Sequence, residues 1–183
     1  MRAANLAIVF VASLCVTAAA PAATTHDVDV GPSFSFTPAD IVIEVGDTVH
    51  WTWISGLHSV ESGVGGVHDG IFRSGDPTST AGTTFDVTFD QAFVDAHPVA
   101  GDVYNYYCAV HFSFGMVGSV EVITCPADLT ADGQVALGDL AQLLSNYGTT
   151  SGAAYADGDL DFDGDVDLQD LAKLLALYGT TCG

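Results

Sequence analysis

The stretch YYCAVHFSFGMVGSVEV, residues 106–122, places a cysteine, a histidine and a methionine in the order C-x2-H-x4-M. Cys108 ends a strand-like run, and His111 and Met116 follow closely enough for one tight loop to carry all three. A second histidine, His58, follows the most hydrophobic strand-like run, TVHWTWI. A soft thiolate, two imidazoles and a weak thioether are the ligands that select copper for electron transfer. Each residue alone has an ordinary structural explanation, but together the four predict a copper site.

The sequence around this motif predicts a mainly β fold. From residue 26 to about residue 123, apolar and polar residues alternate, and β-branched and aromatic residues are frequent. Six runs have this pattern, namely HDVDV, DIVIEV, TVHWTWI, TTFDVTF, VYNYYCAV and GSVEVI, with Gly, Pro and Asp turns between them. About a hundred residues of short strands without long helices indicate a β-sandwich with Greek-key connections.

Two segments of this region resemble plastocyanin-like cupredoxins. Residues 106–122 are similar to the C-terminal ligand loop of that family, and FTPADIVIEVGDTVHWTWISGLHSV is similar to the segment that leads to its first histidine. The resemblance covers roughly residues 25–123. The chain departs from it at Ser59, where plastocyanins commonly have Asn, a neighbour that helps to hold the thiolate loop. The resemblance implies a Greek-key cupredoxin domain with a type 1 blue copper site, whose ligands would be His58, Cys108, His111 and Met116.

Other parts of this region carry narrower predictions. DQAFVDAHPVAG, residues 90–101, is expected to be an insertion-like loop, and residues 24–29 fit either a first strand or a loose arm. Metal binding by one spare histidine, His68, is an alternative to a structural role. The four spare histidines, all expected to be structural or solvent-facing, are His26, His50, His68 and His97.

After Cys125 the pattern changes from strands to helices. DLTADGQVALGDLAQLLSNYGTT, from Asp128, aligns with DLDFDGDVDLQDLAKLLALYGTT, from Asp159, and more than half of the positions are identical. This is an internal duplication. Each copy predicts an Asp-rich loop followed by one helix that ends at a glycine. The predicted apolar stripes are Leu140, Leu143, Leu144 and Tyr147 in the first copy, and Leu171, Leu174, Leu175 and Tyr178 in the second.

The Asp-rich loops predict two calcium sites. Calcium takes six to eight oxygen ligands, and a glycine at loop position six, here Gly133 or Gly164, allows the sharp turn that lets them converge. The first loop has fewer acids, so we expect it to bind more weakly; a solvated acidic loop is the alternative in both. The predicted ligands are Asp128, Thr130, Asp132, Gln134 (through its carbonyl) and Asp139 in the first loop, and Asp159, Asp161, Asp163, Asp165, Asp167 and Asp170 in the second.

The duplicated run closely resembles the dockerin repeat over essentially residues 125–182. Both loops end in Asp instead of Glu and no helix precedes either one, which separates them from an ordinary EF-hand. The resemblance implies a small all-α module that binds calcium and docks onto a cohesin-type partner. It also implies that the two ends of the module lie close together, so that a disulfide between Cys125 and Cys182 is feasible. Cys108 would then be the one free thiol of the mature chain.

The chain begins with a segment typical of exported proteins. Arg2 precedes the apolar run LAIVFVASLCV, and small residues follow it, which predicts cleavage after Ala22. An uncleaved membrane anchor is the alternative. We therefore expect a signal peptide (residues 1–22), a cupredoxin domain (23–124) and a dockerin-like domain (125–183). The mature protein would reach the periplasm, the cell surface or the medium, without an integral membrane span.

The charge of the chain limits its partners. Twenty-three acidic residues against three basic ones give a formal net charge of −20, which excludes a basic surface for nucleic acid and favours redox partners with basic docking surfaces. The chain has no H-x-H pair of the kind that a second copper centre would use, so we do not expect an enzyme. The predicted function is a secreted blue copper electron-transfer protein, tethered by its second module. The alternative is a surface scaffold or adhesion protein in which copper is structural or vestigial.

Overall fold

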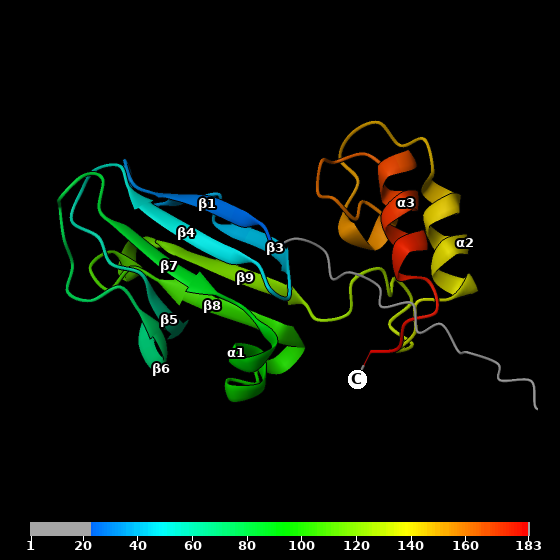
Figure 1. The fold of residues 1–183 in the computed structure, drawn as a ribbon. Helices are drawn as coiled ribbons and strands as arrows, with labels where there is room; N and C mark the ends of the chain where they lie inside the picture. Colours follow the sequence, from blue (N-terminus) through cyan, green and yellow to red (C-terminus); the bar gives the residue numbers. More distant parts are fainter. Residues whose placement is uncertain (1–22, 183) are drawn as a thin grey trace, which may run out of the picture.

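The computed structural model describes residues 23–182, and the predicted signal peptide lies outside this range. Nine strands form two sheets, so the predicted mainly β fold is confirmed (Figure 1). One sheet has the order β2-β1-β4-β7 and the other β3-β9-β8-β5-β6. The strands of the first are β1 (Thr25–Val30), β2 (Phe36–Thr37), β4 (Thr48–Trp53) and β7 (Thr84–Thr88). Those of the second are β3 (Asp40–Glu44), β5 (Glu61–Val64), β6 (Val67–Arg73), β8 (Val103–Tyr107) and β9 (Val117–Ile123).

Alternation along the strands explains the core of the sandwich. In β4, Val49, Trp51 and Trp53 are buried, while the residues between them are only half-buried. Trp51 packs edge-on against Tyr106 of β8, with ring centroids 5.4 Å apart, and so joins the two sheets. Buried aromatic side chains of this size contribute much of the hydrophobic stabilisation of a small domain. Residues 25–30 form β1, which pairs in parallel with β4, so the first-strand interpretation is correct.

Several elements of the sandwich were not predicted, the short strand β2 among them. The β5–β6 hairpin turns at Gly65 and Gly66, whose φ angles of 67° and 74° suit glycine. The insertion-like loop contains a short helix, α1 (Gln91–Ala96), which begins where the side chain of Asp90 accepts a hydrogen bond from the N–H of Phe93. A 3-10 turn, η1 (Ala100–Asp102), then leads into β8.

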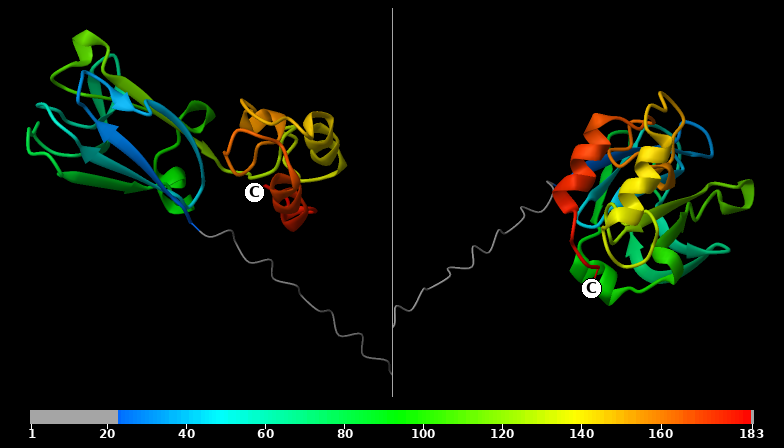
Figure 2. Two further views of the ribbon diagram at one scale, coloured as in Figure 1. Left: turned by 90° about the horizontal axis from the view of Figure 1, so that it is seen from above. Right: turned by 90° about the vertical axis from the view of Figure 1, so that its right-hand side faces the viewer.

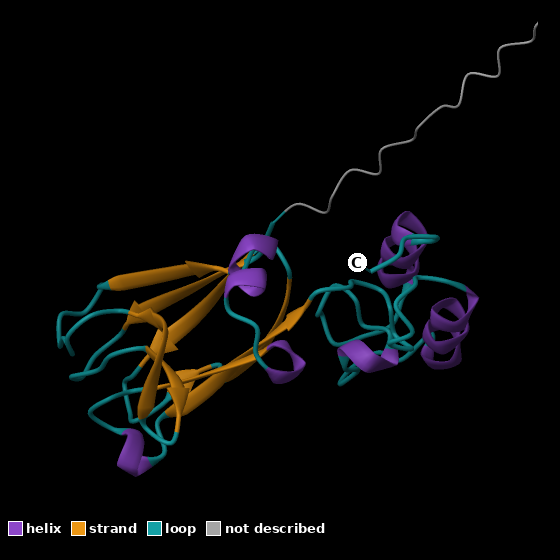
Figure 3. Cartoon of the chain, turned by 90° about the horizontal axis from the view of Figure 1, so that it is seen from below, coloured by secondary structure: helices purple, strands orange, loops and turns teal. Residues whose placement is uncertain are grey.

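The second module has its own hydrophobic core. It contains α2 (Leu137–Asn146), a 3-10 turn η3 (Tyr155–Asp157) and α3 (Leu168–Leu177), which Figure 3 separates clearly from the strands. The predicted apolar stripes are only partly correct, because each helix buries one leucine fully, Leu143 or Leu174. The last leucine and the tyrosine of each stripe are exposed, namely Leu144, Tyr147, Leu175 and Tyr178.

Lys173 connects the second module to the sandwich. Its ammonium lies 2.9 Å from the buried carboxylate of Glu44, at the end of β3, and also donates to the carbonyl of Leu160 (2.8 Å). Burial raises the pKa of Glu44, and Lys173 opposes this by stabilising the charged form. The contact holds α3 beside one end of the sandwich, as the left view of Figure 2 shows. Among the described residues, no helix has the length and apolar character needed to cross a bilayer.

Candidate metal centre

The ligand loop starts where β8 ends. The backbone N–H of Cys108 donates to the carbonyl of Met116 (3.1 Å), which closes the loop at its base. The N–H of His111 donates to the carbonyl of Cys108 (3.2 Å), and a 3-10 turn, η2 (Phe112–Phe114), carries the chain back towards β9. Gly115 has a φ of 83°, a left-handed conformation that glycine adopts without strain. The spacing C-x2-H-x4-M therefore matches one tight loop between two adjacent strands.

Three of the four predicted copper ligands converge on one point. Sγ of Cys108 lies 3.7 Å from Nδ1 of His58 and 3.7 Å from Nδ1 of His111, and the two nitrogens are 3.1 Å apart. The point equidistant from these atoms is about 2 Å from each, within the range of nitrogen and sulfur bonds to first-row metals. Met116 is fully buried in the same core. The donor set therefore fits a copper ion.

The environment of His58 favours the neutral imidazole that a metal requires. His58 follows β4 and is almost fully buried. Burial, and to a smaller extent the nearby His111, lower the pKa of His58, whereas a backbone hydrogen bond with Ser55 opposes this effect. The ring can therefore bind a cation without first releasing a proton at neutral pH.

Gly56 was not predicted to matter, but it determines the space available to the His58 ring. A Cβ atom at Gly56 would lie 2.3 Å from Nε2 of His58, and the φ of +90° at this position also disfavours other residues. No periodic pattern identifies such a residue, because the contact depends on the fold of the loop. Any side chain at this position would displace the imidazole.

An exposed aromatic pair covers the outer edge of the site. The ring of Phe34, from the loop between β1 and β2, stacks on His111 with centroids 4.1 Å apart and planes at 18°. Phe34 is 51% exposed and Phe114 68% exposed, and their centroids are 5.1 Å apart. Phe112, which the sequence placed with His111, instead meets Tyr107 edge-on. We call Phe34, His111 and Phe114 the aromatic patch.

We expect Phe34→Ala to lower the reduction potential of the copper-loaded protein. The change exposes His111 to water, and water stabilises the more highly charged Cu(II) state of the site. An aromatic contact of this kind is worth about 0.5–1.5 kcal/mol, which corresponds to roughly 20–65 mV for one electron. Potentiometric titration measures the shift. Phe114→Ala, which removes a second exposed ring that is tilted against His111 and does not stack on it, should cause a smaller shift. Equal potentials in both variants and the wild type would contradict the prediction.

Ser59 contacts the thiolate loop directly, although it replaces the Asn typical of plastocyanins. It is fully buried, and its hydroxyl accepts a hydrogen bond from the backbone N–H of Ala109 (3.0 Å), the residue after Cys108. The serine side chain is shorter than that of asparagine but still ties the segment after the first histidine to the start of the ligand loop. The start of the ligand loop is therefore supported by a hydrogen bond even though Ser59 stands in place of asparagine.

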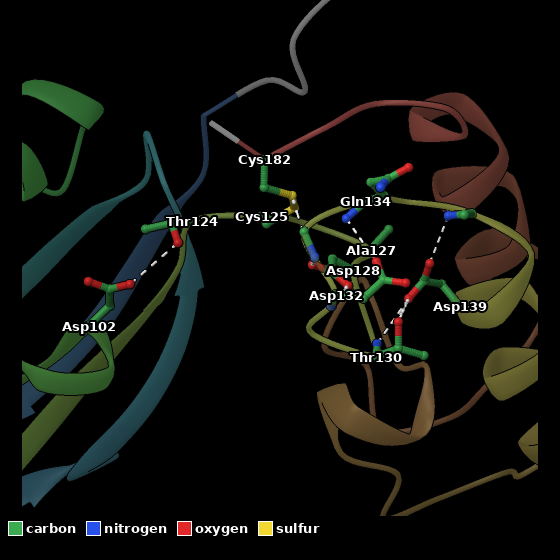
Figure 4. Close-up of a disulfide and its surroundings, with 12 residues drawn as sticks. Asp102, Thr124, Cys125, Ala127, Asp128, Thr130, Asp132, Gln134, Asp139 and Cys182 are labelled. Atoms are coloured by element: carbon green, nitrogen blue, oxygen red, sulfur yellow. Dashed lines mark hydrogen bonds between the residues drawn. A yellow bond between two sulfur atoms is a disulfide. The ribbon is translucent and has the colours of Figure 1, made fainter.

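The disulfide implied by the dockerin resemblance is present. Cys125 and Cys182 are bonded, with their Cα atoms 5.6 Å apart, a typical separation for a disulfide (Figure 4). The bond closes the second module at its two ends. Cys108 is the free cysteine of the described chain and is buried.

In the first Asp-rich loop, hydrogen bonds within the loop occupy the predicted ligands (Figure 4). Asp128 accepts from the N–H groups of Asp132 and Gly133, and Asp139 accepts from the N–H and hydroxyl of Thr130. The backbone N–H of Gln134 donates to Asp132. Within the described residues, these acids do not form a group of three with carboxylate oxygens within 4.8 Å of one another.

The second Asp-rich loop brings its acids closer together. Oxygens of Asp159, Asp161 and Asp170 lie within 4.8 Å of one another, as do those of Asp165, Asp167 and Asp170. Asp163 instead accepts a hydrogen bond from the N–H of Asp165 (3.0 Å). Burial and neighbouring carboxylates raise the pKa values of Asp159 and Asp161. This is the environment in which a bound cation would relieve repulsion.

The spare histidines lie outside these clusters. Asp47 and Asp86 bind His26 and His50, respectively, and the ring of His68 lies 3.0 Å from the carbonyl of Ser62. Among the described residues, none of the four belongs to a group that could hold a metal. His68 lies in β6.

A two-sheet β-sandwich with a buried cysteine and two histidines at one end defines a class of copper-binding proteins. A family model for copper binding proteins, the plastocyanin/azurin family, matches residues 22–123. Because this match spans more than half of the chain, the chain belongs to the plastocyanin/azurin family. The prediction of a cupredoxin is thus confirmed, whereas the dockerin resemblance, which covers residues outside the match, stays a prediction.

Several solved structures are similar to the first part of the chain. Comparison with curated proteins gives no match. An oxidised plastocyanin from the fern Dryopteris crassirhizoma is 21% identical, with 54% of this chain and 100% of that chain covered and a TM-score of 0.41. A purple cupredoxin from Nitrosopumilus maritimus is 29% identical, with 53% of this chain and 98% of that chain covered and a TM-score of 0.40. A pseudoazurin from Methylobacterium extorquens AM1 is 28% identical, with 54% of this chain and 74% of that chain covered and a TM-score of 0.36.

Proposed function

We propose that this chain is an exported type 1 blue copper protein that carries single electrons. The observation that supports this most strongly is the convergence of Sγ of Cys108 with Nδ1 of His58 and of His111. These three residues and Met116 would hold the ion. Copper in such a site supplies one-electron chemistry by changing between the cupric and cuprous states.

The protein residues would keep the site rigid and dry. His58, Cys108 and Met116 are buried in the core of the sandwich, and the backbone bond between Cys108 and Met116 fixes the base of the loop. A rigid site keeps the ligands in nearly the same place in both oxidation states, so little reorganisation accompanies the transfer of an electron. The buried position of the thiolate also protects it from oxidation.

The aromatic patch is the proposed point of electron entry and exit. His111 is the one half-buried residue among the four ligands, and the exposed rings of Phe34 and Phe114 flank it. A small apolar surface made of two exposed rings permits brief docking without a permanent complex. The strong negative charge of the chain would steer partners with basic docking surfaces towards the protein.

We expect the copper-loaded protein to exchange electrons rapidly with a basic c-type cytochrome and slowly with an acidic one. The rate with the basic partner should fall about tenfold or more as the ionic strength rises, because salt screens the attraction. Stopped-flow absorption measures both reactions, and a small neutral reductant serves as the control that salt hardly affects. A protein that binds copper but does not change oxidation state with any of these reagents would instead support the scaffold or adhesion alternative.

We further propose that the second module is a calcium-dependent tether that docks onto a cohesin-type partner. The clustered carboxylates of Asp159, Asp161 and Asp170 support a calcium site in the second loop, and the looser first loop fits weaker binding. The two helices also expose equivalent side chains at matching positions of the duplicated sequence. These exposed pairs are Leu137 with Leu168, Leu144 with Leu175, and Tyr147 with Tyr178. Such a tether would raise the local concentration of the electron carrier near its partners.

A further inference from the structure

A buried glutamate lies beside the candidate metal centre. Glu61 begins β5, which lies between β8 and β6 in the second sheet. Its cross-strand neighbours are Tyr107 in β8 and Arg73 in β6. The carboxylate is only 6% exposed, so its charge is largely removed from water. A buried carboxylate is tolerated only when it is paired and hydrogen-bonded, so its partners are informative.

Glu61 has three partners. The guanidinium Nε of Arg73 lies 3.1 Å from Oε1 of Glu61, and the hydroxyl of Tyr107 donates to Oε2 (3.3 Å). Oε1 also accepts from the hydroxyl of Ser59 (3.4 Å). Arg73 is one of only three basic residues in the sequence, so a large share of the positive charge of this acidic protein is used at this position.

The contact with Ser59 extends this arrangement to the ligand loop. Because the hydroxyl of Ser59 donates to Glu61, its lone pairs remain oriented towards the backbone N–H of Ala109, which donates to it. A charged acceptor at one end polarises the hydroxyl and strengthens the hydrogen bond at the other end. Ser59 and Ala109 directly follow the ligands His58 and Cys108, so this bond joins the two ligand segments.

We infer that Glu61 and Arg73 are positioning residues for the copper thiolate, which act through Ser59. Arg73 holds the carboxylate of Glu61 in place through their ion pair, Glu61 orients the hydroxyl of Ser59, and this hydroxyl fixes the backbone after Cys108. Arg73, Glu61 and Ser59 together hold the backbone after Cys108, a task that a longer side chain after the first histidine would perform alone. The inference rests on the proposed copper function, and it names residues that contact no ligand atom themselves.

The test compares Ser59→Ala and Glu61→Gln with a matched control, Ser62→Ala. Ser62 is equally buried, and its hydroxyl likewise accepts from a backbone N–H, that of Phe72 (2.9 Å), and donates to a carboxylate, that of Asp69. Both of these partners lie in β6 and not in the ligand loop. The control therefore loses the same kind of hydrogen bonds without a direct effect on the loop.

Amide hydrogen exchange in the metal-free full chain is the first measurement. We expect exchange at Ala109 to become about two- to tenfold faster in Ser59→Ala, because the N–H of this exposed residue loses its hydrogen bond to Ser59 and a typical hydrogen bond contributes about 0.5–1.5 kcal/mol. Glu61→Gln should accelerate it less, since glutamine keeps an acceptor but loses the charge. Ser62→Ala should leave Ala109 unchanged. Equal exchange at Ala109 in all four proteins would overturn the inference.

Spectra of the Cu(II)-loaded proteins are the second measurement. Ser59→Ala and Glu61→Gln should shift the visible thiolate band and the copper hyperfine splitting in the EPR spectrum, whereas Ser62→Ala should match the wild type. Unchanged spectra in the first two variants would overturn the positioning role. A wild-type protein without the blue band would overturn the copper function and the inference together, whereas a blue wild type with unchanged variants would overturn the inference alone.

Discussion

Cys108→Ser is expected to abolish the blue colour of the copper-loaded protein. The intense visible band of a type 1 site requires a thiolate bound to Cu(II), and Cys108 is the one free cysteine in the described chain. Its Sγ lies 3.7 Å from each of the two histidine nitrogens, so it is the sulfur that completes the group with them. A serine hydroxyl is neutral at pH 7 and is a poor ligand for copper. We therefore expect the band to disappear and copper affinity to fall by several orders of magnitude.

Visible absorption and EPR spectra of the Cu(II)-loaded variant measure this effect. The matched control is the double variant Cys125→Ser with Cys182→Ser, which removes two sulfurs from the second module and none from the sandwich. The control should remain blue with a small copper hyperfine splitting. Retention of the blue band in Cys108→Ser, or its loss in the double variant alone, would refute the assignment of the ligand loop.

Removal of calcium should destabilise the second module and leave the sandwich folded. Without a cation, the buried carboxylates of Asp159 and Asp170 repel each other across a short distance. When free calcium exceeds its dissociation constant about a thousandfold, binding stabilises the folded state by about 4 kcal/mol. Circular dichroism of the helices, recorded with calcium and with EGTA, measures the difference. In the same copper-loaded sample, the blue band shows separately whether the sandwich remains folded.

The same repulsion predicts how this effect depends on pH. The pKa values of Asp159 and Asp161 are raised in the metal-free fold above those of the unfolded chain. The contribution of these two carboxyl groups to the stability of the metal-free module is therefore greatest at low pH and is lost as the pH rises from about 4 through the raised values. We expect calcium to stabilise the module more at pH 7 than at pH 4.

Single variants distinguish the two Asp-rich loops in their expected response to calcium. Asp170→Asn should remove most of the calcium effect, and Asp139→Asn, its equivalent in the first loop, should remove less, because the acids of the first loop are not clustered. Asparagine preserves the size of the side chain. Identical unfolding curves with calcium and with EGTA in the wild type would show that the loops are solvated acidic turns.

Much of the sandwich could be predicted from the sequence because its strands alternate clearly. The runs around Trp51 and Tyr106 bury every second residue, so their pattern alone identifies β4 and β8. The β5–β6 hairpin was missed because ESGVGGVHDGIFR is rich in glycine and has no regular alternation. The pair Gly65-Gly66 between two valines is a hairpin signal that could have revealed it. Helix α1 is too short to show a helical period.

The candidate site was predictable where it is local and unpredictable where it depends on tertiary contacts. Cys108, His111 and Met116 lie in one loop, so their spacing carries the information. Phe34 reaches His111 from a distant loop, and nothing in the residues around Phe34 indicates this contact. The buried pairing of Glu61 with Arg73 also depends on strand register, which the missed hairpin concealed.

Strand β9 separates the ligand loop from the second module. It begins directly after Met116 and ends just before the second module, towards which it runs in Figure 1. Seven residues of extended chain span about 23 Å, so the ligand loop and the second module lie at opposite ends of the strand. Electron tunnelling weakens exponentially with distance, so transfer through the tethered end would be slow. In the proposed electron carrier, the donor and the acceptor would therefore bind alternately at the aromatic patch, which predicts ping-pong kinetics without a ternary complex.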